Sequence, residues 1–127
     1  MTAPIQPPRS LIRVLLLVED EPSLAEGLAH SLGGSCSVTV AHSSEEARSA
    51  LSRETFDAVI ADLNLRRETA EGLLSEITER HPAVRRILFS GGITASVRPG
   101  LVHAIVPKPA SVEQLLAALR DNDGGDR

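Results

Sequence analysis

Five short aliphatic runs, separated by stretches of helical periodicity, constrain the fold of this chain more than any other feature. The runs occupy, in chain order, residues 12–18, 37–41, 56–61, 86–89 and 104–106. Runs of this length that are apolar almost throughout are typical of strands covered on both faces. Strands that alternate with helices predict an α/β fold, in which right-handed crossovers place helices on both faces of a parallel sheet.

The stretches between the runs have recognisable helix starts. Pro22 suits the first turn of a helix, and Ser43 and Ser111 each begin a capping box, with Glu or Gln three residues later. The fourth connection differs, because residues 93–98 include three β-branched side chains and meet Pro99 at once. Any helix there is about one turn long. We therefore expect five β/α units, with the fourth helix shortened or irregular.

The chain length and the composition of its ends predict one domain. The 127 residues suffice for a single core, whereas residues 1–10 are rich in proline and residues 121–127 are charged and rich in glycine. We expect two disordered tails around a domain that spans residues 11–120. The lone Cys36 fits a buried position in a reducing compartment. No early apolar run is long enough for a signal peptide or a membrane span, so we expect a cytoplasmic protein.

The charge and the aromatic content argue against nucleic acid as a partner. The chain has 13 basic and 17 acidic side chains, which gives a formal net charge of −4. Such a balance does not favour binding along a phosphate backbone. Two phenylalanines, with no tyrosine or tryptophan, provide no stacking platform for single strands. We expect neither nucleic acid nor a membrane to be a partner.

Polar side chains follow four of the predicted strands, at the points where the strands end. They are Glu19 and Asp20 after the first strand, Asp62 after the third, Ser90 after the fourth and Lys108 after the fifth. Ligands of such folds bind outside the carboxyl ends of the strands. In a flavodoxin-like, doubly wound sheet of order 2-1-3-4-5 the first and third strands are neighbours, which brings the three carboxylates together.

Three neighbouring carboxylates repel one another unless a cation lies between them. A site rich in carboxylates suits Mg²⁺, which prefers oxygen ligands. Lys108 adds a compact positive charge that can approach a phosphoryl oxygen, and the Ser90 hydroxyl can donate to another. The residue types therefore predict a site for a phosphoryl group and its metal, with one carboxylate as nucleophile.

Four segments, in order, resemble the receiver domain of two-component response regulators, the CheY-like superfamily. They are Val18–Pro22, Phe56–Asp62, Phe89–Gly91 and Val106–Pro109, and the resemblance extends from Ile12 to Leu119. It implies that a histidine kinase or a phosphotransfer protein phosphorylates Asp62.

The same resemblance implies a role for each site residue. Asp20 and Asp62 would ligate Mg²⁺ directly, Glu19 would act through water, and the main-chain carbonyl of Asn64 would complete the protein ligands. Ser90 and Lys108 would hold the acyl phosphate. The chemistry would be phosphoacceptance and self-dephosphorylation dependent on Mg²⁺, and we expect no dedicated enzyme activity beyond it.

Several positions depart from the family pattern. Arg66 and Ala70 replace the common proline and glycine after the phosphoacceptor, so we expect a reshaped loop. Ile105 replaces the aromatic switch residue. The segment from Ser90 to Lys108 is about four residues shorter than usual, roughly one helical turn. We therefore expect an altered output face, a monomeric protein and an unidentified downstream protein partner.

Other interpretations of the same residues remain open at this point. Asp62 alone is typical of a turn or a helix cap, and residues 19–21 alone suit a solvated charge run at a helix N-terminus. The chain can also be a degenerate receiver that binds a partner without phosphorylation. A small Mg²⁺-dependent phosphohydrolase is a third possibility, disfavoured because no segment suits a substrate cap. Lys108 argues for chemistry, because it is the single lysine among thirteen basic residues.

Overall fold

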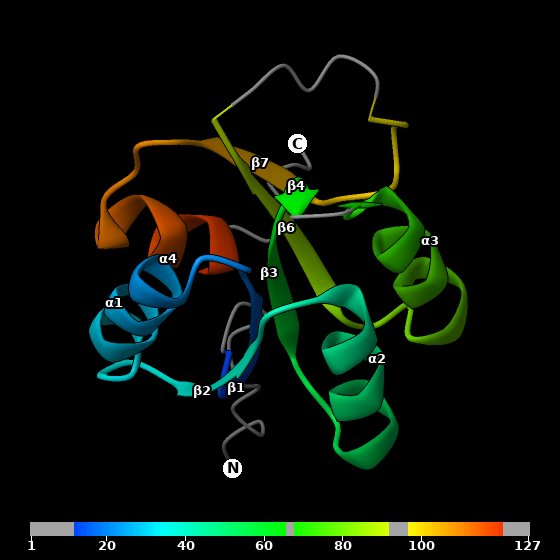
Figure 1. Cartoon of the computed structure of the whole chain (residues 1–127), viewed down its shortest axis with the longest axis horizontal. Coiled ribbons are helices and arrows are strands. Elements are labelled where there is room, and N and C mark those ends of the chain that lie inside the picture. The colour runs from blue at the N-terminus through cyan, green and yellow to red at the C-terminus, as the bar shows by residue number, and fades with distance from the viewer. Residues whose placement is uncertain (1–11, 66–67, 92–96, 121–127) are drawn as a thin grey trace, which may run out of the picture.

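The computed structural model describes residues 12–65, 68–91 and 97–120. Its main sheet has five parallel strands in the order β2-β1-β3-β6-β7 (Figure 1). In chain order, the strands of this sheet are β1 (Val14–Val18), β2 (Ser37–Ala41), β3 (Ala58–Asp62), β6 (Arg85–Ser90) and β7 (Ala104–Pro107). Numbered within the sheet alone, this order is the predicted 2-1-3-4-5, so the flavodoxin-like fold is confirmed.

Helices cover both faces of the sheet. The described part of the chain contains α1 (Pro22–Leu32), α2 (Ser44–Arg53), α3 (Glu71–Arg80) and α4 (Val112–Arg120). In Figure 1, α1 and α4 lie on one face and α2 and α3 on the other. Each pair closes its own apolar core against the sheet.

The two cores explain why the first run is apolar without alternation. Leu15 and Leu17 pack toward α1 and α4, whereas Leu16 and Val18 pack toward α2 and α3. All four side chains are at most 1% exposed. Because successive side chains of a strand point to opposite faces, a central strand between two helix layers needs apolar residues at every position.

The predicted helix caps form, with one difference. At α4, Gln114 N–H donates to Ser111 Oγ and Ser111 N–H donates to Gln114 Oε1, which is a complete capping box. At α2, Glu46 N–H donates to Ser43 Oγ, but the Glu46 carboxylate accepts from His42 N–H, one residue earlier than a capping box requires.

The loop after Asp62 contains a short hairpin that the sequence did not specify. Strands β4 (Asn64–Leu65) and β5 (Glu68–Thr69) pair antiparallel, and Glu68 Oε2 accepts a hydrogen bond from Ser44 N–H at the start of α2. Ala70, one of the two positions that depart from the family pattern, directly follows this hairpin. Its N–H donates to Leu63 O, and its side chain is buried. Arg66 lies outside the described residues.

The connection between β6 and β7 is described only in part. The weak helix expected over residues 93–98 falls mostly on residues 92–96, which lie outside the described ranges, as do the two predicted tails. Residues 97–103 form bends and turns. Cys36, expected in the core, is half-buried and packs against the core of α1 and α4.

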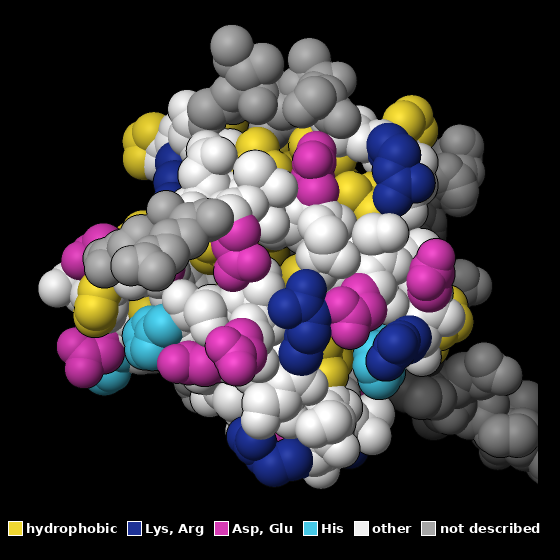
Figure 2. All heavy atoms as spheres, turned by 45° about the vertical axis from the view of Figure 1, so that its right-hand side comes forward, with side chains coloured by type: hydrophobic (Ala, Val, Ile, Leu, Met, Phe, Trp, Pro, Cys, Tyr) yellow, Lys and Arg dark blue, Asp and Glu magenta, His cyan; other side chains and the backbone are white. Residues whose placement is uncertain are grey.

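Charged side chains are interspersed on the face formed by α2 and α3. Figure 2 shows acidic and basic groups close to one another there, and Arg48 Nε lies 2.7 Å from Glu76 Oε1 across the two helices. Within the described ranges, no helix has the length and apolar character needed to cross a membrane.

Candidate functional site

Three carboxylates meet at the carboxyl ends of β1 and β3. Glu19 and Asp20 follow β1, and Asp62 is the last residue of β3. The two strands are neighbours in the sheet, with Val18 opposite Ala61. One carboxylate oxygen from each residue lies within 4.8 Å of the others. The structure therefore brings Glu19, Asp20 and Asp62 together as the sequence predicted.

The three carboxylates differ in exposure and in hydrogen bonds. Glu19 is 1% exposed and Asp62 is 7% exposed, whereas Asp20 is half-buried. Glu19 Oε2 accepts a hydrogen bond from Glu21 N–H at 3.2 Å, and Asp62 Oδ1 accepts one from Asn64 N–H at 3.2 Å. Glu19 Oε1 is buried and accepts no hydrogen bond from the described residues. Buried polar atoms in folded proteins are seldom left in this way.

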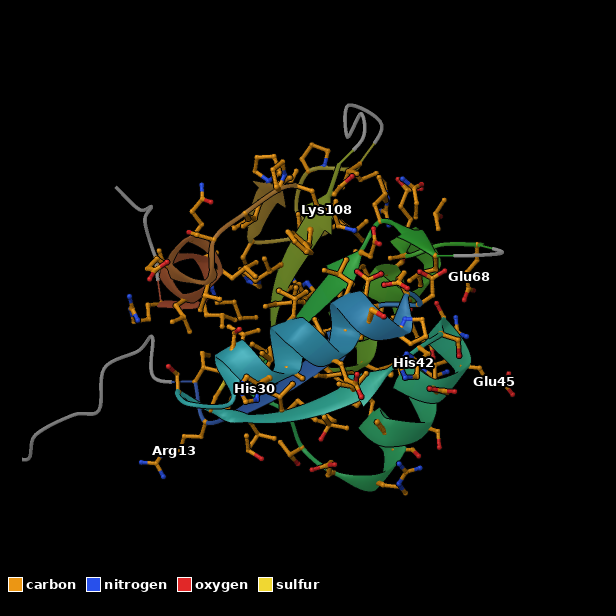
Figure 3. All side chains as sticks on the ribbon, turned by 60° about the vertical axis from the view of Figure 1, so that its left-hand side comes forward. Arg13, His30, His42, Glu45, Glu68 and Lys108 are labelled. Carbon is orange, nitrogen blue, oxygen red and sulfur yellow. The ribbon has the colours of Figure 1, made fainter. Side chains whose placement is uncertain are left out.

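Lys108 reaches this cluster from the other side of β6. Its Nζ donates to Asp62 Oδ2 at 2.9 Å and lies 3.5 Å from Glu19 Oε1, a distance of an ion pair and not of a good hydrogen bond. Lys108 N–H also donates to Ser90 O at 2.8 Å, which ties the ends of β6 and β7 together. Figure 3 shows Lys108 at the carboxyl end of the sheet and Arg13 at the opposite end.

The local charge is negative. One ammonium faces three carboxylates, which leaves a surplus of two negative charges when all are ionised. Burial and, after it, the Asp62 charge raise the pKa of Glu19, against the lowering effects of Glu21 N–H and Lys108. Burial by itself lowers the pKa of Lys108, but the hydrogen bond and charge of Asp62, helped by Glu19, outweigh it and raise that pKa.

The donor set fits a hard divalent cation. All donors are carboxylate oxygens, and one of them, Glu19 Oε1, has no hydrogen bond within the described residues. Oxygens that share an octahedral Mg²⁺ at about 2.1 Å lie roughly 3 to 4 Å apart, which is compatible with the observed spacing. A doubly charged ion would also balance the surplus charge. The residues present therefore fit such a metal.

The other predicted residues, Ser90, Asn64 and Ile105, have fewer contacts that define a role. Ser90 ends β6 and is 2% exposed, and Asn64 is exposed in β4, directly beyond Leu63. The use of the Asn64 carbonyl as a metal ligand stays a prediction. Ile105 is 43% exposed on β7, at the edge of the sheet, where the sequence resemblance led us to expect an aromatic residue.

The sequence did not identify two residues that contact the site. His42 Nδ1 lies 3.0 Å from Glu19 O, and the ring centroid of Phe89 lies 5.0 Å from Lys108 Nζ. The His42 contact depends on a turn geometry with no sequence signature. Phe89 was predictable from the sequence, because it precedes Ser90 on β6, the strand between β3, which carries Asp62, and β7, which Lys108 follows.

Comparison with known proteins identifies a family. The response regulator receiver domain matches residues 15–120. The chain is 28% identical to the hydrogenase transcriptional regulatory protein HoxA of Cupriavidus necator over 84% of this chain and 23% of that protein. It is 29% identical to a response regulator receiver protein of Anaeromyxobacter over 83% of this chain and 46% of that protein. It therefore spans less than half the length of either relative.

A solved structure gives the same result. A response regulator protein from Burkholderia pseudomallei, determined with a phosphorylated aspartic acid, a calcium ion and citrate, superposes with a TM-score of 0.80 at 26% identity. The match covers 87% of this chain and 68% of that one.

Proposed function

Because the chain belongs to the response regulator receiver domain family of two-component signalling, we propose that Asp62 is its phosphoacceptor. Receiver domains interact with histidine kinases or phosphotransfer proteins and bind a divalent metal. The observation that supports Asp62 is its position at the end of β3, in contact with Lys108 and beside Glu19 and Asp20. No other aspartate of the described residues has this combination of neighbours.

The proposed reaction is a phosphoryl transfer. An Asp62 carboxylate oxygen forms a bond to phosphorus as the bond from phosphorus to the donor breaks, and the donor group leaves with the electron pair. The Lys108 ammonium then pairs with a phosphoryl oxygen instead of Asp62 Oδ2, and the Ser90 hydroxyl donates to another. Glu19, Asp20, Asp62 and the Asn64 carbonyl would hold Mg²⁺, which neutralises charge on the transferring group.

The donor that this proposal assigns is a histidine kinase or a phosphotransfer protein, and the assigned place of action is the cytoplasm. Acyl phosphate chemistry of this kind needs little from the donor beyond a reactive phosphoryl group and correct alignment. Small phosphate donors can therefore replace the protein donor in a test.

Incubation with Mg²⁺ and acetyl phosphate tests the proposal. Intact-mass measurement should show one added phosphoryl group on the wild-type protein, sensitive to base and to hydroxylamine. The Asp62→Ala variant should show none. Asp57→Ala is the matched control, because Asp57 accepts hydrogen bonds from the N–H groups of Arg13 and Val14, away from the cluster. Equal labelling of the wild-type and Asp62→Ala proteins would contradict the proposal.

We further propose that the phosphorylated form acts on a downstream protein as a monomer, through a changed output face. Ile105 has no hydroxyl and no flat ring to follow Ser90, so the phosphoryl group has fewer contacts to bias on that side. Hydrogen exchange with and without beryllofluoride should change in the loops after Asp62 and Ser90. Strong changes across residues 104–119, together with dimerisation, would overturn this part.

A degenerate receiver that binds a partner without phosphorylation is the second candidate. Two features favour it, the exposed Ile105 and the non-helical residues 97–103. Both belong to the face through which we expect a phosphorylated receiver domain to contact its downstream partner. The acetyl phosphate experiment separates the two candidates, since a degenerate receiver gains no phosphoryl mass.

A further inference from the structure

The sheet places one aromatic ring between the nucleophile and the lysine. Asp62 on β3 is paired with Phe89 on β6, and Phe89 is paired with Val106 on β7. Residues paired in this way in a parallel sheet point to the same face. Lys108 follows Val106 by two residues and shares its face. To reach Asp62, its side chain must therefore cross β6 between Gly91 and Phe89.

The observed contacts agree with this path. Lys108 Nζ lies 5.0 Å from the centroid of the Phe89 ring while it donates to Asp62 Oδ2 at 2.9 Å. The stem of the lysine passes Gly91, where an added Cβ would lie 3.5 Å from Lys108 Cβ. The ring is 3% exposed, and the lysine side chain is 25% exposed. The ammonium thus lies over a buried aromatic ring while it pairs with the Asp62 and Glu19 carboxylates.

An aromatic ring attracts an ammonium group electrostatically, whereas an aliphatic side chain does not. The negative face of the ring quadrupole interacts favourably with a cation within about 6 Å of the centroid, more strongly when the cation is partly desolvated. This attraction does not depend on the charge of Asp62. It therefore persists when the carboxylate has become an acyl phosphate and no longer pairs with the lysine as a free carboxylate.

We propose that Phe89 is a positioning residue that holds the Lys108 ammonium over β6, ready for the phosphoryl group that the proposed function brings to Asp62. Without the ring, the flexible lysine stem spends more time in rotamers that point to solvent. The fraction of molecules with a correctly placed ammonium falls, and the apparent reactivity falls by the same fraction.

The chain offers a matched control. It has two phenylalanines, Phe56 and Phe89, and both are 3% exposed. Phe56 packs in the core of α2 and α3, on the opposite side of the sheet from the core that includes Phe89. Phe56→Leu and Phe89→Leu therefore remove the same group from equally buried positions, but only Phe89→Leu removes a ring from beneath Lys108.

The first measurement needs no metal and no phosphate. Because Lys108 is the only lysine, protein grown with lysine labelled with ¹³C at Cε gives one lysine side-chain signal. Protons above an aromatic face resonate upfield, so this signal should be shifted upfield in the wild type, in Phe56→Leu and in Phe89→Tyr. In Phe89→Leu it should move to the position of free lysine. An unchanged signal in Phe89→Leu would show that the ring does not hold the lysine and would overturn the proposal.

The second measurement is the rate of phosphorylation by acetyl phosphate with Mg²⁺. Phe89→Leu should be about threefold to tenfold slower than Phe56→Leu, from the usual strength of a partly exposed cation–π contact. Phe89→Tyr, which keeps the ring, should recover most of the rate. Equal rates for the two leucine variants would overturn the positioning role. A wild-type protein that accepts no phosphoryl group would overturn the proposed function instead, and the lysine signal alone would then decide the contact.

Discussion

Two cations at opposite ends of neighbouring strands show how differently this protein treats buried charge. Lys108 follows β7 and faces the carboxylates of Asp62 and Glu19, which it does not balance. Arg86 lies near the start of β6, is 6% exposed and makes no ion pair with a described residue. Among the residues that the structure describes, its guanidinium donates only to main-chain carbonyls. Both charges are costly to bury, but only the Arg86 region has all of its buried polar side-chain atoms hydrogen-bonded within the described residues.

The hydrogen bonds of the Arg86 guanidinium are complete because main-chain carbonyls of the fold itself accept them. Nε donates to Leu101 O at 2.9 Å and Nη1 to Val84 O at 3.0 Å, with longer contacts to Pro82 O and Gly100 O. These carbonyls belong to the turns before β6 and before β7. Burial lowers the pKa of Arg86, although an arginine keeps its charge in proteins. The guanidinium thus holds residues 100–101 in place by hydrogen bonds. These residues belong to the connection between β6 and β7, in which no described residue is helical.

In these two regions, hydrogen-bond completeness separates a structural charge from a functional one. The guanidinium needs no further partner, so it stabilises a single arrangement. The carboxylate cluster has a surplus negative charge and an oxygen, Glu19 Oε1, without a hydrogen bond from the described residues. A ligand that supplies positive charge would complete it.

Replacement of Arg86 should give the largest effect on stability. Arg86→Ala leaves the buried carbonyls of Val84 and Leu101 without their donor, and we expect a loss of about 2 to 4 kcal/mol in the free energy of unfolding. Urea denaturation measures it. Arg98→Ala is the control, because Arg98 is exposed and its single hydrogen bond to a described side chain is a 3.3 Å contact with Ser75 Oγ. We expect a change within about 0.5 kcal/mol. Equal losses in the two variants would remove the distinction between the regions.

Replacement of Asp20 should change the free energy of unfolding in the opposite direction. Asp20→Asn removes one of three like charges, so the metal-free protein should be as stable as the wild type or slightly more stable. The affinity for Mg²⁺ should fall about tenfold or more because a charged ligand is lost. Asp20→Ala should abolish both metal binding and phosphorylation. If isothermal titration gives the same Mg²⁺ affinity for Asp20→Ala and wild type, the metal does not bind between these carboxylates.

Lys108→Arg tests whether position matters beyond charge. The guanidinium is longer and planar, so it should not occupy the place of the ammonium between Asp62 and the Phe89 ring. We expect phosphorylation by acetyl phosphate to slow about threefold to tenfold, with stability close to that of the wild type. Lys108→Met, which has neither charge nor donor, should be slower still. Wild-type rates in Lys108→Arg would show that charge alone is sufficient.

The smallest effect should come from His103 beside Arg86. His103 Nδ1 accepts a hydrogen bond from Arg86 N–H at 2.9 Å, and burial, followed by the charges of Arg86 and Arg85, lowers the pKa of His103. The unfolded chain then binds more protons than the folded one, so stability is lost as pH falls from about 6.5 through the lower folded pKa. Because the burial of His103 is only partial and much of the residue stays in contact with solvent, the loss should be small. His103→Gln keeps a hydrogen-bond acceptor, so the urea midpoint of this variant should depend less on pH between pH 7.5 and pH 5.5 than that of the wild type. The same pH dependence in both proteins would contradict this assignment.

The sequence predicted the parts of the fold that depend on local patterns. Apolar runs gave the strands, capping residues such as Ser111 gave the helix starts, and the preference for right-handed crossovers gave the layers. The site followed from the fold, because residues at the carboxyl ends of adjacent strands must meet. The meeting of Glu19 and Asp62 needed no further information once the strand order was known.

The parts that the sequence missed depend on three-dimensional context. Arg86 binds carbonyls whose directions are set by turns, and carbonyls are present at every residue, so no residue type signals such a contact. The pairing of β4 with β5 involves two residues on each strand, too few for a periodic pattern. Phe89 was predictable in principle from the register of β3, β6 and β7, but only after those strands had been aligned.

Phosphorylation of Asp62 is tested by locating the phosphoryl group chemically. Protein treated with acetyl phosphate and Mg²⁺ is reduced with borohydride, which converts an acyl phosphate of aspartate into homoserine, and then digested and sequenced by mass spectrometry. We expect homoserine at position 62, and none when Mg²⁺ is omitted or when Asp20 is replaced by alanine. Homoserine at Asp20 or Asp57, or unmodified aspartate at every position, would contradict it.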